Sequence, residues 1–326
     1  MANYLLTGTA GFIAFRVAEL LLKEGHTVYG IDNLNDAYDI RLKNYRLQRL
    51  QNLPNFFFKK LDVSEKSLGD ALRDWLPENI AGVINLAARA GVRTSLTDPW
   101  VYVNTNLIGT LNLLEFCRHS GIQKFILAST SSLYAERSEP PFQETDDTDH
   151  PLQPYAASKK GAEAMAYAYH HLYDLDITVL RYFTVYGPAG RPDMVMFRFC
   201  QWIAKDRPVI VNGDGEQSRG FTYLDDIARG TIQALIPLGY QVINLGGHEV
   251  ITINQLITML EARIGKKARV EYQPFHKADV RTNKADTQKA NQLLGWQPQV
   301  TLEEGVTHLV NWYMQERNWA SQVDTP

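Results

Sequence analysis

The stretch YLLTGTAGFIA, residues 4–14, decides the fold of this chain, because a short strand pattern leads into a glycine turn there. An amphipathic helical pattern over residues 12–23 follows the turn directly. Gly8 permits a tight turn, and Gly11 lets backbone N–H groups and a helix N-terminus approach a pyrophosphate. Ala14 is small enough for the helix to pack closely on the strand. We therefore predict a dinucleotide-binding turn made by Gly8, Gly11, Phe12 and Ile13.

The pattern that begins at this turn repeats through the first half of the chain. Short apolar runs at 4–7, 27–31, 56–61, 82–86, 124–129 and 178–182 alternate with helical patterns at 12–23, 39–51, 68–75, 100–119 and 155–173. Strands of this length joined by crossover helices form a parallel sheet with helices on both faces. The sequence therefore predicts an α/β fold with a doubly wound parallel sheet of the Rossmann type.

The residue at the end of the second predicted strand indicates which dinucleotide binds. Asp32 can accept hydrogen bonds from an adenosine ribose, and its charge would repel a 2′-phosphate, so NAD is favoured over NADP. The alternative is a plain turn with an exposed aspartate, which the preceding glycine turn makes the weaker interpretation. Further contacts with NAD are predicted where strands end, at Asn33, Asn35, Asp62, Val63, Leu86, Ala87, Ala88 and Tyr182.

A tyrosine and a lysine four residues apart open the predicted helix at 155–173. Tyr155 and Lys159 share one helical face, so a lysine ammonium can act on the phenol. An unperturbed tyrosine has a pKa near ~10, and nearby positive charge, including that of a nicotinamide ring, would stabilise the phenolate. Thr130, at the end of the fifth strand, can hydrogen-bond the reacting oxygen. Alone, such a pair is more often an accident of the surface, but after a dinucleotide turn we interpret Thr130, Tyr155 and Lys159 as catalytic and expect Tyr155 and Lys159 to contact NAD.

After residue 182 the pattern changes to loops rich in glycine and proline. We predict an NAD-binding domain over 1–182 and a smaller C-terminal α/β substrate lobe over 183–326. The strand at 241–246 is expected to return to the main sheet, and residues 253–264 and 302–315 are expected to form helices.

Composition narrows the function classes. The chain has 326 residues and a net charge of −3, which gives no electrostatic basis for binding nucleic acid or an anionic membrane. It contains no run of 18 apolar residues and no leader pattern, so we expect a cytoplasmic protein. His170 and His171 lack the companion ligands of a metal site, so no metal is expected, and packing or interface roles are favoured for both.

Several segments resemble the extended short-chain dehydrogenases/reductases, and within them most closely the UDP-glucuronate 4-epimerases. The similar stretches are GIDNLNDAYDIRLK, LAARAGVRTSL, ASTSSLY, HPLQPYAASKKGAE, LRYFTVYGPAGRPDM and RGFTYLDDIA. The resemblance implies a UDP-sugar substrate and a homodimer formed through a four-helix bundle of the helices at 100–119 and 155–173. It implies substrate contacts from Ser131, Ser132, Thr184 and Arg191 at the sugar and its carboxylate, from Arg93 near the diphosphate or sugar, from Arg219 at the diphosphate, and from Asp279 at the uridine ribose.

Some positions depart from the family pattern or bear on the reaction. Gly220 stands where aspartate is common, and Ala135 stands where glycine is usual. An arginine that only braces its loop is an equal alternative for Arg191. Dehydratases of this fold carry acids after the threonine, and decarboxylases carry a glutamate at the position of Ser132. With Ser131 and Ser132 here, elimination of water lacks its acid and base.

The resulting hypothesis is a UDP-glucuronate 4-epimerase that interconverts UDP-glucuronate and UDP-galacturonate. It would act through a transient 4-keto sugar that rotates to present its other face before the hydride returns, and NAD would stay bound throughout. The alternatives are a UDP-glucose/UDP-galactose or other UDP-sugar epimerase, a net oxidoreductase using free NAD and, more remotely, a non-catalytic NAD-binding scaffold.

Overall fold

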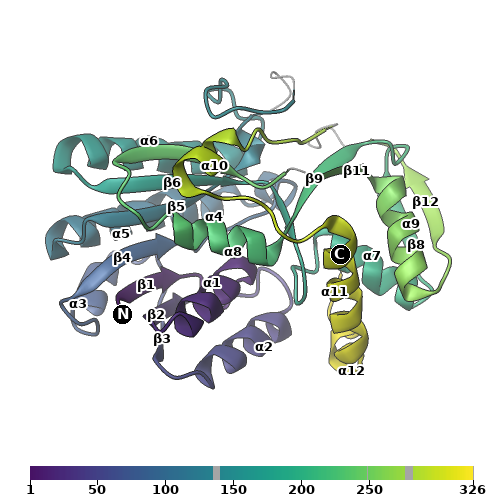
Figure 1. The fold of residues 1–326 in the computed structure, drawn as a ribbon, viewed down its shortest axis with the longest axis horizontal. Helices are drawn as coiled ribbons and strands as arrows, with labels where there is room; N and C mark the ends of the chain where they lie inside the picture. Colours follow the sequence, from purple (N-terminus) through teal and green to yellow (C-terminus); the bar gives the residue numbers. More distant parts are fainter. Residues whose placement is uncertain (135–139, 248, 276–281, 326) are drawn as a thin grey trace.

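A seven-stranded parallel sheet forms the centre of the protein, which the computed structural model describes over residues 1–134, 140–247, 249–275 and 282–325 (Figure 1). The strand order is β10-β6-β5-β4-β1-β2-β3, so the direction of winding reverses between β1 and β4, as in a doubly wound fold. The predicted Rossmann-type sheet is therefore confirmed. The strands are β1 (Asn3–Thr7), β2 (Thr27–Asp32), β3 (Phe56–Lys60), β4 (Ile80–Asn85), β5 (Lys124–Thr130), β6 (Asp176–Tyr182) and β10 (Tyr240–Leu245).

Helices cover both faces of this sheet because successive strand residues point to opposite sides. On β1, Leu6 packs in a core with α1, α8 and α10, whereas Leu5 packs in a second core with α3, α5 and α6. The helices are α1 (Phe12–Lys23), α2 (Ile40–Gln51), α3 (Leu68–Arg73), α4 (Pro99–Tyr102), α5 (Gly109–Ser120), α6 (Pro154–Tyr173), α8 (Leu224–Gln233) and α10 (Gln288–Leu294).

The helix predicted at 100–119 differs from the expectation of one regular helix. It consists of α4, a π-helical segment η2 (Val103–Ile108) and α5. Asn106 lies buried in η2, where its side chain bonds the backbone N–H and C=O of Arg89 and donates to the Ser158 hydroxyl at 2.9 Å. These bonds stabilise the π-helical turn. Helical periodicity in the sequence does not predict them.

The chain after Tyr182 contributes both to a second group of elements and to the main sheet. A three-stranded sheet contains β7 (Thr184–Tyr186), β9 (Ser218–Tyr223) and β11 (Glu249–Thr252), and a pair contains β8 (Pro208–Asn212) and β12 (Arg269–Gln273). Side chains from α7 (Val195–Ala204), α9 (Ile253–Ile264) and α11 (Leu302–Gln315) fill the core there, and α12 (Arg317–Ala320) follows α11.

This second group lies at one end of the molecule, with α7, α9, β8 and β12 at the right of Figure 1. β10 pairs with β6 in the main sheet, and α8 contacts α1. The domain boundary at residues 182/183 stays a prediction. Among the described residues, no helix is both long and apolar enough to span a membrane.

Candidate active site

The glycine turn after β1 leaves room for a ligand because neither of its glycines can carry a side chain. Gly8 has φ +69°, and a Cβ on it would lie 2.8 Å from the Ala87 Cα. A Cβ on Gly11 would lie 2.7 Å from the Gly8 carbonyl oxygen, which already accepts the Gly11 N–H. The turn therefore presents bare backbone at the N-terminus of α1, which is the geometry that a pyrophosphate requires.

A cavity of about 630 Å³ opens beside this turn, at the carboxyl ends of β1, β2, β3 and β4. Nine residues predicted to bind the cofactor line it: Gly8, Gly11, Asp32, Asn33, Asn35, Val63, Leu86, Ala87 and Ala88. Of the other predicted cofactor residues, Phe12, Ile13, Asp62, Tyr155, Lys159 and Tyr182 are not part of this lining. Asp62 lies just behind it and accepts a 2.7 Å hydrogen bond from Asn33.

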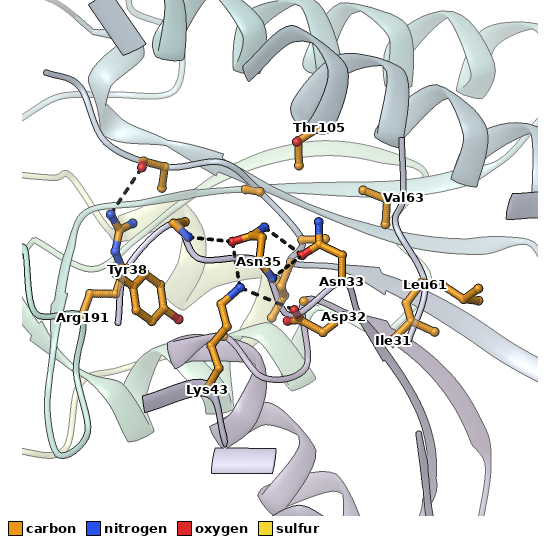
Figure 2. Close-up of a pocket in the computed structure, with 17 residues that line it drawn as sticks. Ile31, Asp32, Asn33, Asn35, Tyr38, Lys43, Leu61, Val63, Thr105 and Arg191 are labelled. Carbon is orange, nitrogen blue, oxygen red and sulfur yellow. Dashed lines mark hydrogen bonds and ion pairs between the residues drawn. The ribbon is translucent and has the colours of Figure 1, made fainter. Parts of the chain in front are cut away.

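The carboxylate at the end of β2 is held by three neighbouring groups. Asp32 accepts hydrogen bonds from the backbone N–H groups of Ala10, at 3.2 Å, and Leu34, at 2.7 Å. The ammonium of Lys43 lies 3.6 Å from the same carboxylate oxygen that Leu34 bonds, and it donates to the Asn35 side chain at 3.0 Å (Figure 2). A carboxylate has more acceptor positions than these bonds use, so ribose hydroxyls can still bind.

Lys43 is a site residue that the sequence interpretation missed. It is buried and belongs to α2, and Figure 2 shows its side chain reaching from that helix to Asp32 and Asn35. A signal existed, since Lys43 and Arg46 fall on the same helical face as Leu42, Leu47 and Leu50. Charged residues on an apolar face require a polar partner inside the protein.

The bare glycine turn, the fixed carboxylate and the cavity between them fit an NAD molecule. The glycine turn would hold the pyrophosphate on backbone N–H groups, and Asp32 with Lys43 and Asn35 would hold the adenosine ribose. Within the described ranges, no three His, Cys, Asp or Glu side chains gather in a way that could bind a metal ion.

The three predicted catalytic residues come together where β5 meets α6. The Thr130 hydroxyl lies near enough to the Tyr155 phenol to favour its ionised form. The Thr130 oxygen accepts the N–H of Ser132 at 3.1 Å, and its hydroxyl proton remains available for donation. Lys159 is buried and donates to the Ala128 carbonyl oxygen at 2.9 Å, two residues before Thr130 on the same strand.

Burial controls the ionisation of this group. It raises the pKa of Tyr155, while the hydrogen bond from Thr130 and the charge of Arg191 act in the opposite direction. Burial also lowers the pKa of Lys159 to about 8, against the charge of Glu163, which favours the ammonium. The charge that acts on the phenol in this structure is therefore that of Arg191, and a cationic ring beside Tyr155 would lower its pKa further.

A second cavity, of about 660 Å³, lies beyond the first, among β8, α7 and β9. Three of the predicted substrate residues line it, namely Arg93, Thr184 and Arg219. Arg93 donates to the side-chain oxygen of Asn212 at 2.9 Å, with the Asn212 amide oriented to accept. Three arginines line this cavity, namely Arg93, Arg198 and Arg219, and they make it suitable for an anionic group such as a diphosphate.

The remaining predicted substrate residues have varied surroundings. Ser131 and Ser132 form the turn η3 (Ser131–Leu133) after Thr130, and neither lines the two cavities. The Ser131 hydroxyl accepts from the side-chain amide of Asn283 at 3.2 Å, a contact that no sequence motif indicated. Asp279 and Ala135 lie outside the described residues.

Arg191 lines the first cavity rather than the second. Its guanidinium binds both carboxylate oxygens of Asp193, with Nε–Oδ1 at 3.1 Å and Nη2–Oδ2 at 2.6 Å. A bond to the Ala90 carbonyl oxygen at 3.4 Å links it to the segment after β4. The bond to Asp193 within its own loop is the contact expected of a bracing arginine, while its electrostatic effect on Tyr155 ties it to the reaction site.

Gly220, where aspartate is common among similar sequences, has a structural explanation. A Cβ at this position would lie 2.5 Å from the Gly247 carbonyl oxygen and 2.7 Å from that of Asn283. The Gly220 N–H donates to the same Asn283 oxygen at 2.7 Å. Strand β9 therefore packs too closely on two backbone segments for any side chain to be tolerated.

A doubly wound sheet with a glycine turn, an acidic residue ending β2 and a Thr–Tyr–Lys group at β5 and α6 defines the NAD-dependent extended short-chain dehydrogenases/reductases. The chain belongs to the family of that class described as GDP-mannose 4,6 dehydratase, whose model matches residues 5–309. It is 57% identical over 314 residues to UDP-glucuronate 4-epimerase of Thermodesulfobacterium geofontis, an alignment covering 96% of each chain.

Solved structures of 4-epimerases share the fold of this chain. The UDP-glucuronic acid 4-epimerase of Bacillus cereus, in complex with UDP-glucuronic acid and NAD, superposes with a TM-score of 0.90 and 38% identity, covering 96% of this chain and 99% of that one. The UDP-glucose 4-epimerase of Thermotoga maritima, with UDP-glucose, superposes with a TM-score of 0.89 and 33% identity, covering 97% and 99%.

Proposed function

We propose that this protein is an NAD-dependent isomerase that interconverts UDP-glucuronate and UDP-galacturonate, acting as a UDP-glucuronate 4-epimerase. The observation that carries the proposal is the grouping of Thr130 and Tyr155 where β5 meets α6, with buried Lys159 bound to the Ala128 carbonyl oxygen on the same strand. The similarity to 4-epimerases over nearly the whole chain supports the same conclusion.

When bound, NAD would supply the acceptor for the hydride from C4 of the sugar, and its reduced form would supply the donor of that hydride to the opposite face of the sugar. Tyr155 takes the proton of the 4-hydroxyl and returns it when the ketone is reduced. Thr130 donates a hydrogen bond to the 4-oxygen of the sugar, whose proton Tyr155 takes. Lys159, which is held against the Ala128 carbonyl, would bind the nicotinamide ribose. Between the two steps the sugar rotates to present its other face, while Arg93 and Arg219 hold its diphosphate. Because the hydride is returned to the same sugar, no net redox change occurs.

A uronic acid adds a requirement, since the 4-keto sugar is a β-keto acid that can lose its carboxylate. Holding the carboxylate so that its bond to C5 lies poorly aligned with the ketone prevents this loss. Ser131, Ser132, Thr184 and Arg191 are the residues we assign to that role. Because Ser131 and Ser132 stand where dehydratases have acids, the epimer rather than an elimination product is expected.

The test is incubation of the purified protein with UDP-glucuronate, followed by chromatography that resolves UDP-galacturonate from UDP-glucuronate and from UDP-pentose. UDP-galacturonate should form without added NAD, and UDP-glucose under the same conditions should react far more slowly. A Tyr155→Phe variant should lose about 10²- to 10⁴-fold in rate. The proposal fails if the wild type forms only UDP-pentose, or if UDP-glucose is the better substrate.

A homodimer in the cytoplasm is part of the proposal. Exposed apolar side chains gather on the helical segments predicted to pair, with Trp100, Val103 and Ile108 on α4 and η2, and Tyr167 and Leu172 on α6. Pairing these helices with their copies as a four-helix bundle would remove that surface from water.

A further inference from the structure

The Arg191–Asp193 ion pair occupies the boundary between the two cavities. Arg191 lines the cofactor cavity and Asp193 lines the second cavity, although only one residue separates them in the sequence. Both side chains are largely buried, with 22% and 31% of their surfaces exposed. The pair is therefore only partly exposed, and it borders both cavities.

The chemistry of a uronic acid brings its carboxylate to this pair. C5, which bears the carboxylate, is bonded to C4, whose hydroxyl faces Tyr155 in the proposed function. Arg191 is close enough to Tyr155 for its charge to favour the phenolate. A carboxylate placed next to the reacting carbon therefore lies near the same guanidinium.

The fork of that guanidinium is already occupied. Its Nε and Nη2 atoms, which form the edge that binds a carboxylate with two parallel bonds, both donate to Asp193. A second carboxylate can use this edge only by displacing Asp193 or sharing the bonds with it. An Arg191 side chain without the Asp193 partner would bind the carboxylate of a uronate more strongly than the paired arginine can.

We propose that Asp193 is an internal competitor for Arg191, which the substrate carboxylate replaces, and that it sets how strongly the site prefers an acidic sugar to a neutral one. The inference rests on the proposed function. Before substrate binds, Asp193 holds Arg191 in place and compensates its buried charge. When a uronate binds, one carboxylate contact replaces another, so affinity for the two epimers stays moderate and both can leave.

The test measures the dissociation constants of UDP-glucuronate and UDP-glucose by calorimetry on the NAD-loaded protein. All variants carry Tyr155→Phe so that neither ligand is turned over. Asp193→Asn removes the competitor and keeps its shape, so UDP-glucuronate should gain about five-fold in affinity relative to UDP-glucose. Asp193→Glu keeps the competing charge and should leave the ratio of the two constants near that of the parent.

A further variant ties the effect to the arginine. Combining Asp193→Asn with Arg191→Met should abolish the gain in relative affinity for UDP-glucuronate, because the guanidinium that Asp193 occupied is then absent. If Asp193 only braces the loop, Asp193→Asn will lower the preference for UDP-glucuronate or leave it unchanged, and the inference is then wrong. If Asp193→Asn does not fold, Asp193→Ser carries the same expectation.

These outcomes can be told apart from failure of the proposed function itself. Lack of turnover of UDP-glucuronate by the wild type would reject the function, whatever the ratio of dissociation constants. Turnover by the wild type together with an unchanged ratio in Asp193→Asn would reject the competitor role alone.

Discussion

At the scale of single residues, the chemistry depends on opposed effects on two ionisable groups. Burial makes the phenolate of Tyr155 and the ammonium of Lys159 both harder to form. Thr130 and Arg191 favour the phenolate, and Glu163 favours the ammonium. The sequence interpretation assigned the stabilisation of the phenolate to Lys159 and the nicotinamide, whereas Lys159 directs its ammonium to the Ala128 carbonyl oxygen.

The first prediction concerns the pH dependence of epimerisation. In the NAD-loaded protein, where the charge of the nicotinamide lowers the pKa of Tyr155, the rate should rise as Tyr155 ionises. It should fall as pH passes about 8, where Lys159 loses its proton, because burial lowers the pKa of Lys159 to about 8. Thr130→Val removes the bond that favours the phenolate, so the rising limb should move to higher pH. The rate should also fall about 10²-fold.

Profiles of kcat/KM against pH, measured with UDP-glucuronate, check this prediction. Thr130→Ser is the matched control, since it keeps the hydroxyl, and its rising limb should stay close to that of the wild type. An unshifted profile for Thr130→Val would show that the Thr130–Tyr155 bond does not control the ionisation of Tyr155.

The second prediction concerns Lys43. Lys43→Met keeps the length of the side chain but removes its bond to Asn35 and its charge beside Asp32. NAD should bind about 10-fold more weakly, because the adenosine ribose loses an ordered partner and Asp32 loses its counter-ion. Fluorescence titration of cofactor-free protein with NADH measures this, with the exposed Lys23→Met as control. Unchanged affinity in Lys43→Met would exclude Lys43 from the cofactor site.

At the scale of elements, one face of α6 aligns the catalytic group on the end of β5. Tyr155, Lys159 and Glu163 recur every four residues, and they meet Thr130, the Ala128 carbonyl and the Ser129 hydroxyl respectively. Glu163 is also bound through both oxygens by Arg181 of β6, at 3.0 and 2.8 Å. The strand and helix are therefore locked together directly beside the phenol.

A third prediction follows for Glu163. Its ion pair with Arg181 is almost fully buried, so Glu163→Gln leaves a cation without its partner and should lower the free energy of unfolding by about 3–5 kcal/mol. The same change removes the charge that favours the Lys159 ammonium, so the falling limb of the pH profile should move to lower pH.

Urea unfolding and the pH profile measure the two effects of Glu163→Gln. Glu303→Gln is the control for stability, because Glu303 belongs to an exposed pair with Arg263 and should change it little. A stable Glu163→Gln protein with an unshifted profile would contradict both parts of the prediction.

At the scale of the whole molecule, the site lies between two bodies of structure. The sheet and α6 supply the Thr–Tyr–Lys group, the carboxyl ends of β1 to β4 border the cofactor cavity, and β8, β9 and α7 supply the second cavity. The exposed apolar side chains of α4, η2 and α6 lie outside the linings of both cavities.

The fourth prediction tests the dimer. Ile108→Glu places a charge on η2 within the surface expected to pair, so the protein should change from dimer to monomer. Size-exclusion chromatography with light scattering gives the mass directly. Ile236→Glu is the control, since Ile236 is similarly exposed but lies outside those helices, and it should leave the mass unchanged. A wild-type monomer would reject the homodimer itself.

The sequence by itself determined the order of strands and helices along the chain, the glycine turn, Asp32 and the spacing of Tyr155 and Lys159. These features are local, because periodicity, turn chemistry and i, i+4 geometry act over a few residues. It also placed the strand near 241–245, which pairs with β6 in the main sheet.

Tertiary structure alone decided which distant groups meet. Lys43 reaches Asp32 across α2 and β2, Asn283 reaches Ser131 over more than a hundred residues, and Asp193 takes the Arg191 fork between two cavities. Such contacts depend on where folded elements pack, and so does the burial that raises the pKa of Tyr155 and lowers that of Lys159. A motif specifies which chemical groups are present, whereas packing sets their solvation and their partners.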